Sequence, residues 1–343
     1  MILSEKAEDN FIQRYFAPLA TGIEALGLHD DAAQVPVPEG QFLVVSMDTL
    51  VSDVHFFDDD PADTIARKAL RVNLSDLASK GCVPHGYFLS LAMPESRLRS
   101  DSWMTSFSAG LAADQASFGV RLMGGDTVRS PNQSVVSICA FGFVPDGKMV
   151  TRSGANLGDR IYVTGTIGDS AVGLLSRQAR LFGKSKLTDN DQAIYELIST
   201  ASHEILENRY LVPDPKMSSI AALSRYATAA MDISDGLVGD ANTLANASNV
   251  GLQVRLGSIP HNHALLEHLD KYNLQGLLIT GGDDYEILCT VPEPDAPAFE
   301  SVMRADGVPV TYVGDVVAGR GVSFLDTKNS PIDLGKTSFD HFS

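Results

Sequence analysis

The chain has 343 residues, of which 44% are apolar and 20% are charged, a composition typical of globular proteins and not of disordered ones. Its 43 acidic and 26 basic residues leave a net charge of −17, which argues against a nucleic-acid partner because phosphate backbones require a basic surface. The longest apolar stretches, such as residues 135–144, are too short to span a membrane, and the N-terminus is charged where a signal peptide would be apolar. We therefore expect a cytoplasmic protein with no membrane partner.

Hydrophobic patterning predicts alternating strands and helices in the first half of the chain. Apolar side chains recur at helical spacing in some segments and gather in short β-rich runs in others. In chain order we predict an amphipathic helix at 11–19, a strand at 41–48, a helix at 63–79, a strand at 87–93, a helix at 100–119, and strands at 120–123 and 134–144. A Pro-Asp-Gly turn at 145–147 then predicts a domain boundary.

The second half repeats this mixed pattern, so the length and the boundary predict an α+β fold in two domains, residues 1–148 and 149–343. A Gly-Thr-Ile-Gly turn at 165–168 joins its first strand to its first helix, and we interpret it as a structural turn rather than a phosphate contact. In chain order we predict a strand at 160–164, helices at 169–181 and 189–207, a strand at 227–231, a helix after residue 235, a strand at 277–279, and a last strand and loop from residue 310.

Three cysteines, Cys82, Cys139 and Cys289, are far apart and form no CxxC pair. This spacing argues against a structural zinc site and against a disulfide framework. Each lies among apolar residues, which is typical of small buried side chains.

Aspartates recur at the ends of apolar segments or interrupt them. Any one of them is more often a turn former or a helix cap. Turns and helix caps do not explain all of these aspartates together, because an ionised side chain among apolar residues is costly unless it is paired or bound to metal. The set comprises Asp30, Asp31, Asp48, Asp76, Asp126, Asp232, Asp235, Asp283 and Asp284.

Magnesium explains why these residues are aspartates. Mg²⁺ prefers oxygen ligands in an octahedron and keeps several waters, so one or two carboxylates per ion suffice. Two Gly-Gly-Asp corners, at 124–126 and 281–283, would let backbone N–H groups approach a phosphate without a Cβ in the way. We therefore predict an enzyme that holds a nucleotide's phosphates through Mg²⁺ on strand-end loops.

Two further side chains have a functional and a structural interpretation. Arg152, just past the boundary, is either a phosphate contact or a surface arginine, and its spacing does not decide between them. A lone histidine such as His55 in an extended stretch is more often structural than functional.

Taken together, these segments resemble the thiamine-monophosphate kinases, which share a superfamily with aminoimidazole ribonucleotide synthetase and selenophosphate synthetase. The similar segments occur in the family's order over nearly the whole chain. They are residues 30–33 (DDAA), 47–51 (MDTLV), 55–56 (HF), 72–78 (VNLSDLA), 124–127 (GGDT), 151–155 (TRSGA), 232–237 (DISDGL), 281–288 (GGDDYEIL) and 339–342 (FDHF).

The resemblance implies a two-domain aminoimidazole ribonucleotide synthetase-like fold, a homodimer joined through N-terminal sheets, and several Mg²⁺ ions between aspartates and ATP. The N-terminal domain would bind ATP and metal, and the C-terminal α+β domain would complete the nucleotide and substrate site. By position, the implied metal ligands are Asp31, Ser46, Met47, Asp48, Asp76, Asp126, Asp232 and Asp235; the ATP contacts are Gly125, Asp126, Arg152 and Ser234; and the thiamine monophosphate contacts are His55, Asp283 and Phe339.

Four positions depart from the family's usual pattern. His29 stands in place of a common glycine, and Met47 in place of a common threonine, so a metal contact there must come from a backbone carbonyl or from Ser46. Asp283 replaces a glutamate and Phe339 replaces a tyrosine or tryptophan. The last two changes concern the acceptor and leave the ATP contacts untouched.

The implied reaction is direct in-line transfer of the γ-phosphoryl group of ATP to thiamine monophosphate. A phosphate oxygen, with a second pKa of about 6, attacks without a general base, and none is evident in the sequence. An amidine-ring-closing synthetase of the same superfamily and a metal-loaded binding protein without turnover are the alternatives. The terminal Asp-His-Phe and the segment around His55 favour the kinase, and ATP turnover would distinguish all three.

Overall fold

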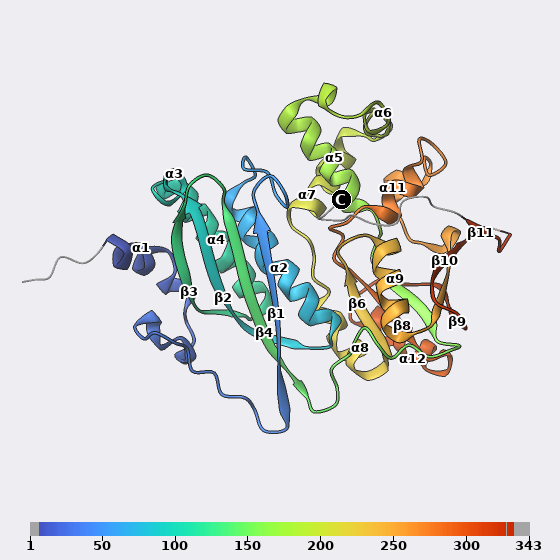
Figure 1. The fold of residues 1–343 in the computed structure, drawn as a ribbon, viewed down its shortest axis with the longest axis horizontal. Helices are drawn as coiled ribbons and strands as arrows, with labels where there is room; N and C mark the ends of the chain where they lie inside the picture. Colours follow the sequence, from blue (N-terminus) through green and yellow to red (C-terminus); the bar gives the residue numbers. More distant parts are fainter. Residues whose placement is uncertain (1–6, 327, 333–343) are drawn as a thin grey trace, which may run out of the picture. The chain divides into compact units, whose positions relative to one another are not determined.

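The computed structural model describes residues 7–326 and 328–332, with side chains from residue 10 onward. It divides into two compact units, residues 1–77 with 82–147, and residues 78–81 with 148–343. Each unit contains its own sheet and helices (Figure 1).

The first unit is a four-stranded sheet of order β1-β4-β2-β3, in which only β2 and β3 run parallel. Side chains alternate along β1: Val44 and Leu50 are buried, whereas Val45 and Met47 are exposed. In Figure 1 the helices α2 and α4 lie on one face of this sheet. The elements are α1 (Ala7–Tyr15), η1 (Ala17–Leu19), η2 (Ile23–Leu28), β1 (Gln41–Val51), α2 (Ala62–Ser79), β2 (Val83–Pro94), α3 (Glu95–Leu98), α4 (Asp101–Phe118), β3 (Arg121–Ser130) and β4 (Val135–Pro145).

The second unit is a seven-stranded sheet of order β11-β10-β7-β9-β5-β8-β6. Its strands are β5 (Arg160–Thr164), β6 (Ala229–Ile233), β7 (Gly251–Arg255), β8 (Glu286–Val291), β9 (Val310–Val317), β10 (Gly321–Leu325) and β11 (Pro331–Ile332). Its helices are α5 (Asp169–Phe182), η3 (Lys184–Lys186), α6 (Asp189–Leu197), α7 (Thr200–Leu211), η4 (Met217–Ser219), α8 (Ile220–Tyr226), α9 (Leu237–Ser248), η5 (Leu256–Ser258), α10 (His263–Leu266), α11 (Leu274–Thr280), η6 (Glu293–Asp295) and α12 (Ala296–Ala305).

Apolar side chains cover both faces of the larger sheet. Ile161 and Val163 of β5 belong to the same core cluster as Leu244 of α9, whereas Tyr162 between them packs with Phe299 of α12. The alternation of strand side chains therefore divides the core into two layers, as expected for a sheet buried on both faces. The polar side chains of this unit that were predicted to bind substrates lie at or beyond the strand ends, outside these two apolar layers.

Several expectations about elements are wrong. Residues 189–207 belong to two helices, because Ser199 caps the N-terminus of α7 by accepting a hydrogen bond from the Ser202 N–H. Residues 277–279 belong to helix α11, since a three-residue apolar run does not distinguish strand from helix. Gly124, Gly125 and Asp126 are not a corner but lie inside β3, and β1 likewise continues three residues past Asp48.

None of the helices in the described part of the chain combines the length and the apolar character that a membrane span requires.

Candidate active site

A first acidic group joins strand β1 to helix α2. Ser46 and Asp48 lie on the β1 face that packs on α2, and the Ser46 hydroxyl donates a hydrogen bond to Asp76 of α2. The Asp48 N–H donates to Oδ1 of Asn73, one turn earlier on α2, at 3.1 Å. The predicted ligands Ser46, Asp48 and Asp76 are thus brought together, whereas the Met47 side chain is 63% exposed on the opposite face. Any metal contact of Met47 would use its backbone carbonyl.

The carboxyl group of Asp48 is unusually hard to ionise. Burial, with the nearby charge of Asp76 as a second cause, raises the pKa of Asp48 from 3.8 to about 6. A bound cation would reverse this effect, since an adjacent positive charge favours the ionised carboxylate. Two carboxylates and a hydroxyl form an all-oxygen donor set, which fits the preference of Mg²⁺.

We expect Asp48→Asn to stabilise the metal-free protein at pH 8 by about 1–2 kcal/mol, because a neutral amide removes the cost of a half-buried charge. The wild-type carboxyl has a raised pKa, so the stability it contributes is complete below its ordinary pKa of 3.8 and is lost as the pH rises through about 6. The two proteins should therefore differ little at pH 4. Urea unfolding with a chelator present measures this; equal stability at pH 8 would contradict the raised pKa.

A second acidic group lines a cavity of about 480 Å³ in the first unit. Asp30 and Asp31 follow η2, and Gly125 and Asp126 come from β3. The cavity also has apolar lining residues, so it offers both carboxylates and hydrophobic contact. The apolar lining includes Ile12, Phe16, Leu28, Phe88, Leu122 and Met123.

Gly125 is required by the packing of the sheet itself. A Cβ at this position would lie 1.9 Å from the carbonyl oxygen of Leu89, its partner on β2. A Cβ at Gly124 would instead lie 3.4 Å from the ring of Phe88, an ordinary contact. Gly125 therefore lets β3 approach β2 closely, and the next residue, Asp126, is exposed at the cavity.

His55 has a structural partner. Its Nδ1 accepts a hydrogen bond from the Val51 N–H at 3.1 Å, and its carbonyl oxygen accepts one from Lys68 Nζ at 3.0 Å. These bonds fix the turn that follows β1 and orient the imidazole ring. These bonds give His55 a structural role in the turn, and its predicted contact with the acceptor stays a prediction.

In the second unit, the connection from β6 to α9 carries three of the predicted residues. Asp232 is buried at the end of β6, Ser234 is half-buried, and Asp235 is exposed. Asp240 of α9, which the sequence reasoning missed, accepts hydrogen bonds from the N–H groups of both Ser234 and Asp235 at 3.0 Å. Burial raises the pKa of Asp240 to about 7.

The loop at 281–285 carries Asp283, the predicted acceptor contact. Its neighbour Asp284 is 1% exposed and accepts hydrogen bonds from the N–H groups of Gly168 and Ser170 at the start of α5. The turn at 165–168 therefore uses its Gly168 N–H for an internal hydrogen bond, which agrees with its interpretation as structural. Burial raises the pKa of Asp284 well above its ordinary range.

Arg152 is exposed, and its backbone carbonyl accepts a hydrogen bond from Ser248 Oγ at 3.0 Å. Phe339 lies outside the described residues. Within the part of the chain that the structure describes, no three histidine, cysteine or acidic side chains are arranged closely enough to hold a metal ion by themselves. A metal here would take one or two carboxylates and complete its shell from phosphate oxygens and water.

Comparisons with known proteins decide the family. Residues 29–144 match the N-terminal domain of AIR synthase related proteins, and residues 156–326 match the C-terminal domain. The chain is 39% identical over 341 residues to thiamine-monophosphate kinase of Escherichia coli (strain K12), covering 98% of each chain. The chain belongs to the thiamine-monophosphate kinase family.

Solved structures agree with this assignment. The thiamine-monophosphate kinase from Stenotrophomonas maltophilia K279a superposes with a TM-score of 0.79 at 35% identity, covering 94% of this chain and 96% of that one. AaThiL complexed with AMPPCP and TMP superposes with a TM-score of 0.73 at 28% identity, covering 91% of each. The predicted AIR synthase-like fold of two α+β domains is confirmed, whereas the residue roles implied by the thiamine-monophosphate kinase family stay predictions.

Proposed function

We propose that this chain transfers the γ-phosphoryl group of ATP to thiamine monophosphate, giving ADP and thiamine diphosphate. The observation that carries the proposal is the full-length match to thiamine-monophosphate kinase at 39% identity. A structural neighbour has been solved with AMPPCP and TMP together, which supports one site that takes both a nucleotide and an acceptor.

The cavity of the first unit supports nucleotide binding. Its apolar lining residues suit the base, and its carboxylates suit phosphates that are accompanied by cations. Gly125 lines the cavity with its backbone, since it has no side chain, and Asp126 beside it adds a carboxylate. We infer that these two residues contact ATP, together with Arg152 and Ser234 of the second unit.

Magnesium is the inferred metal. Its ligands would be drawn from the predicted set of Asp31, Ser46, the Met47 carbonyl, Asp48, Asp76, Asp126, Asp232 and Asp235. The raised pKa of Asp48 supports this role, because burial and the nearby Asp76 carboxylate disfavour its ionised form, which a bound cation would favour. When bound, Mg²⁺ neutralises charge on the triphosphate and so reduces repulsion between the two anionic substrates.

The chemistry needs little more from the protein than orientation. The attacking phosphate oxygen of the acceptor is largely ionised at neutral pH, so no side chain must remove a proton. The side chains of this chain therefore hold the two substrates in line and exclude competing water. We infer that His55, Asp283 and Phe339 contact the acceptor, and that the aromatic ring of Phe339 faces the cationic thiazolium.

Phosphorus NMR of ATP, thiamine monophosphate and Mg²⁺ with the purified protein tests the proposal. We expect ADP and thiamine diphosphate to appear together in equal amounts, with both the acceptor and the metal required. Release of inorganic phosphate without thiamine diphosphate would contradict the transfer. Turnover only with a formylglycinamidine-type ribonucleotide would move the protein to the ring-closing branch of the superfamily.

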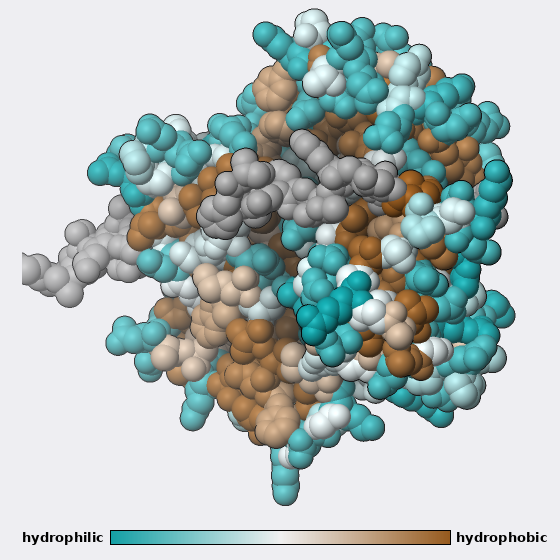
Figure 2. All heavy atoms as spheres, turned by 45° about the vertical axis from the view of Figure 1, so that its right-hand side comes forward, coloured by the Kyte–Doolittle hydropathy of each residue, from teal (hydrophilic) through white to brown (hydrophobic). Residues whose placement is uncertain are grey.

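A homodimer is the inferred assembly. Leu43, Val45 and Met47 project from one face of β1 and are 49%, 53% and 63% exposed, although all three are apolar. Figure 2 shows apolar side chains gathered at the lower left, at the height of the lower end of β1 in Figure 1. Contiguous apolar surface of this kind is typical of a protein interface.

We expect Val45→Asp to convert the dimer to a monomer, because a charge would have to be buried in the interface. Sedimentation velocity measures the change in mass. Leu157→Asp is the matched control, since Leu157 is 64% exposed in the second unit and should not alter the assembly. A monomeric wild-type protein would overturn the inferred homodimer.

A further inference from the structure

Two buried aspartates of the second unit have no assigned role, yet each holds a loop that carries predicted binding residues. Asp284 is 1% exposed and Asp240 is 3% exposed. Each accepts two backbone N–H hydrogen bonds, which is a strong arrangement because the acceptor carries a charge when ionised. We call residues 281–285 the acceptor loop and residues 233–236 the nucleotide loop.

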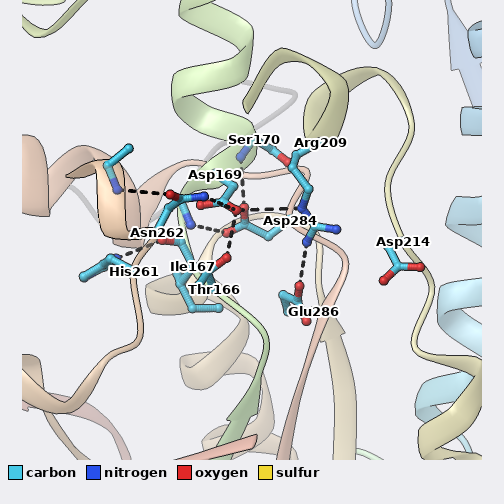
Figure 3. Close-up of polar contacts among 12 residues, drawn as sticks. Thr166, Ile167, Asp169, Ser170, Arg209, Asp214, His261, Asn262, Asp284 and Glu286 are labelled. Atoms are coloured by element: carbon cyan, nitrogen blue, oxygen red, sulfur yellow. Dashed lines mark hydrogen bonds and ion pairs between the residues drawn. The ribbon is translucent and has the colours of Figure 1, made fainter. Parts of the chain in front are cut away.

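Asp284 ties the acceptor loop to helix α5. One carboxylate oxygen accepts from the Gly168 N–H at 2.7 Å and the other from the Ser170 N–H at 3.2 Å. Figure 3 shows Asp284 beside Asp169 and Ser170 at the start of α5, with Arg209 and Glu286 next to them. Because the two oxygens serve different donors, an amide at this position could keep only one of the two bonds.

Glu286 fixes the other end of the same loop. Its carboxylate accepts hydrogen bonds from Thr164 Oγ1 at 2.6 Å and from Arg209 at 2.6 Å, and it lies 3.0 Å from Lys216 Nζ. Glu286 is 1% exposed, so these partners compensate a buried charge. The C-terminal end of the acceptor loop is therefore held in place by Glu286, the first residue of β8.

The acceptor loop is held in a conformation that its residues do not prefer. Asp283 has φ of 70° and Tyr285 has φ of 50°, both in the left-handed region that favours glycine. Such backbone persists only where its surroundings determine it. The Asp283 N–H donates to the Ser234 carbonyl at 2.8 Å, the Tyr285 N–H donates to the Ile233 carbonyl at 2.8 Å, and the Tyr285 hydroxyl lies 3.3 Å from Asp283 Oδ1.

Asp240 holds the nucleotide loop in a different way. A single oxygen, Oδ2, accepts from both the Ser234 and the Asp235 N–H groups, each at 3.0 Å. An asparagine at this position could therefore keep both bonds, whereas an alanine would lose both. This difference predicts opposite effects of an asparagine, which should disturb the acceptor loop at position 284 and preserve the nucleotide loop at position 240.

We propose that Asp284 is a positioning residue for the acceptor and Asp240 is a positioning residue for the nucleotide. Asp284 would act by fixing the direction of Asp283, and Asp240 by fixing Ser234 and Asp235. This inference rests on the proposed function, since it concerns the two substrates of that reaction.

Steady-state kinetics with ATP and thiamine monophosphate varied in turn tests these roles. For Asp284→Asn we expect the KM for thiamine monophosphate to rise about tenfold, the scale of one lost buried hydrogen bond, and the KM for ATP to change less than about threefold. For Asp240→Ala we expect the KM for ATP to rise about tenfold and the KM for thiamine monophosphate to change less than about threefold. For Asp240→Asn both KM values should stay within about threefold of wild type.

Two further variants distinguish an effect on binding from an effect on folding. Tyr285→Phe removes only the hydroxyl that contacts Asp283, and it should raise the KM for thiamine monophosphate about threefold without affecting ATP. Asp159→Asn is the matched control. Asp159 is 4% exposed and accepts from the Asn156 N–H and the Thr228 hydroxyl, outside both loops, so neither KM should change by more than about twofold.

The outcomes separate this inference from the proposed function. Folded Asp284→Asn and Asp240→Ala variants that raise both KM values equally, or neither, would overturn the positioning roles while the wild type still makes thiamine diphosphate. A wild-type protein that binds AMPPCP in calorimetry but does not phosphorylate thiamine monophosphate would overturn the proposed function. In that case, a lower AMPPCP affinity of the Asp240→Ala variant than of the wild type, with wild-type affinity in Asp240→Asn, would still support the positioning role of Asp240.

Discussion

We expect the Asp126→Asn variant to have a kcat at least about a hundredfold below wild type, on the scale of losing one strong electrostatic contact in an active site. Asp126 is exposed and lines the first unit's cavity, so the change leaves the core intact. The amide keeps the size of the side chain but removes the charge that would bind the cation. ADP formation at saturating substrates measures the effect.

Asp146→Asn serves as the control for that variant. Asp146 is also an exposed aspartate of the first unit, but it lies in the turn after β4, where its N–H donates to the Gly40 carbonyl. Its substitution should leave kcat within about twofold, as for most surface changes. Near-normal turnover in a folded Asp126→Asn protein would remove Asp126 from the active site.

Free thiamine should be phosphorylated at less than about a hundredth of the rate of thiamine monophosphate. Its hydroxyl would need a general base, and the described residues offer no evident one: His55 Nδ1 already accepts from the Val51 N–H, and burial raises the pKa of the Cys82 and Cys289 thiols to about 12. Free thiamine also lacks the phosphate that the cations would orient. A coupled assay for ADP with each acceptor measures the ratio.

The acceptor comparison requires equal saturation. Rates should be compared at several concentrations, since a weak acceptor with a normal kcat indicates lost binding rather than a missing base. Comparable kcat values for thiamine and thiamine monophosphate would contradict the mechanism without a base and would direct attention back to His55.

The elements with strong periodicity could be predicted from the sequence. The expected helix at 63–79 corresponds to α2, the helix at 100–119 to α4, and the strand at 160–164 to β5. Each combines regular apolar spacing with a clear end, such as Gly119 in the left-handed region after α4. Residues 277–279 carried no such signal, because three apolar residues fit a buried strand as well as the last turn of α11.

The position of the aspartates along the strands could not be predicted. Asp48 and Asp126 lie inside β1 and β3 because pairing with neighbouring strands continues past them, Asp48 with Ile138 and Asp126 with Ser90. The Gly-Gly pair suggested a turn, yet Gly125 is needed for a close strand contact that depends on residues far away in the chain. A single sequence does not contain that distance information.

Asp240 and Asp284 were missed as positioning residues for a related reason. Their donors are backbone N–H groups, which carry no residue-specific signal. Asp240 is five residues beyond Asp235, and its place among the apolar residues of α9 is the clue that could have identified a buried partner. The sequence places Asp284 beside Asp283 among the clustered aspartates, but the two side chains have different partners.

Alternate residues of strand β1 belong to the acidic group and to the exposed apolar face, and this limits how the chain can change in evolution. Ser46 and Asp48 face α2, whereas Val45 and Met47 form the exposed apolar face. Side chains of a strand alternate with a period of two, so inserting or deleting one residue upstream would exchange the two sets. The carboxylate would then point away from α2, and the apolar side chains would occupy the acidic group. We therefore expect homologues to vary in β1 by substitution and to avoid single-residue gaps between positions 43 and 48.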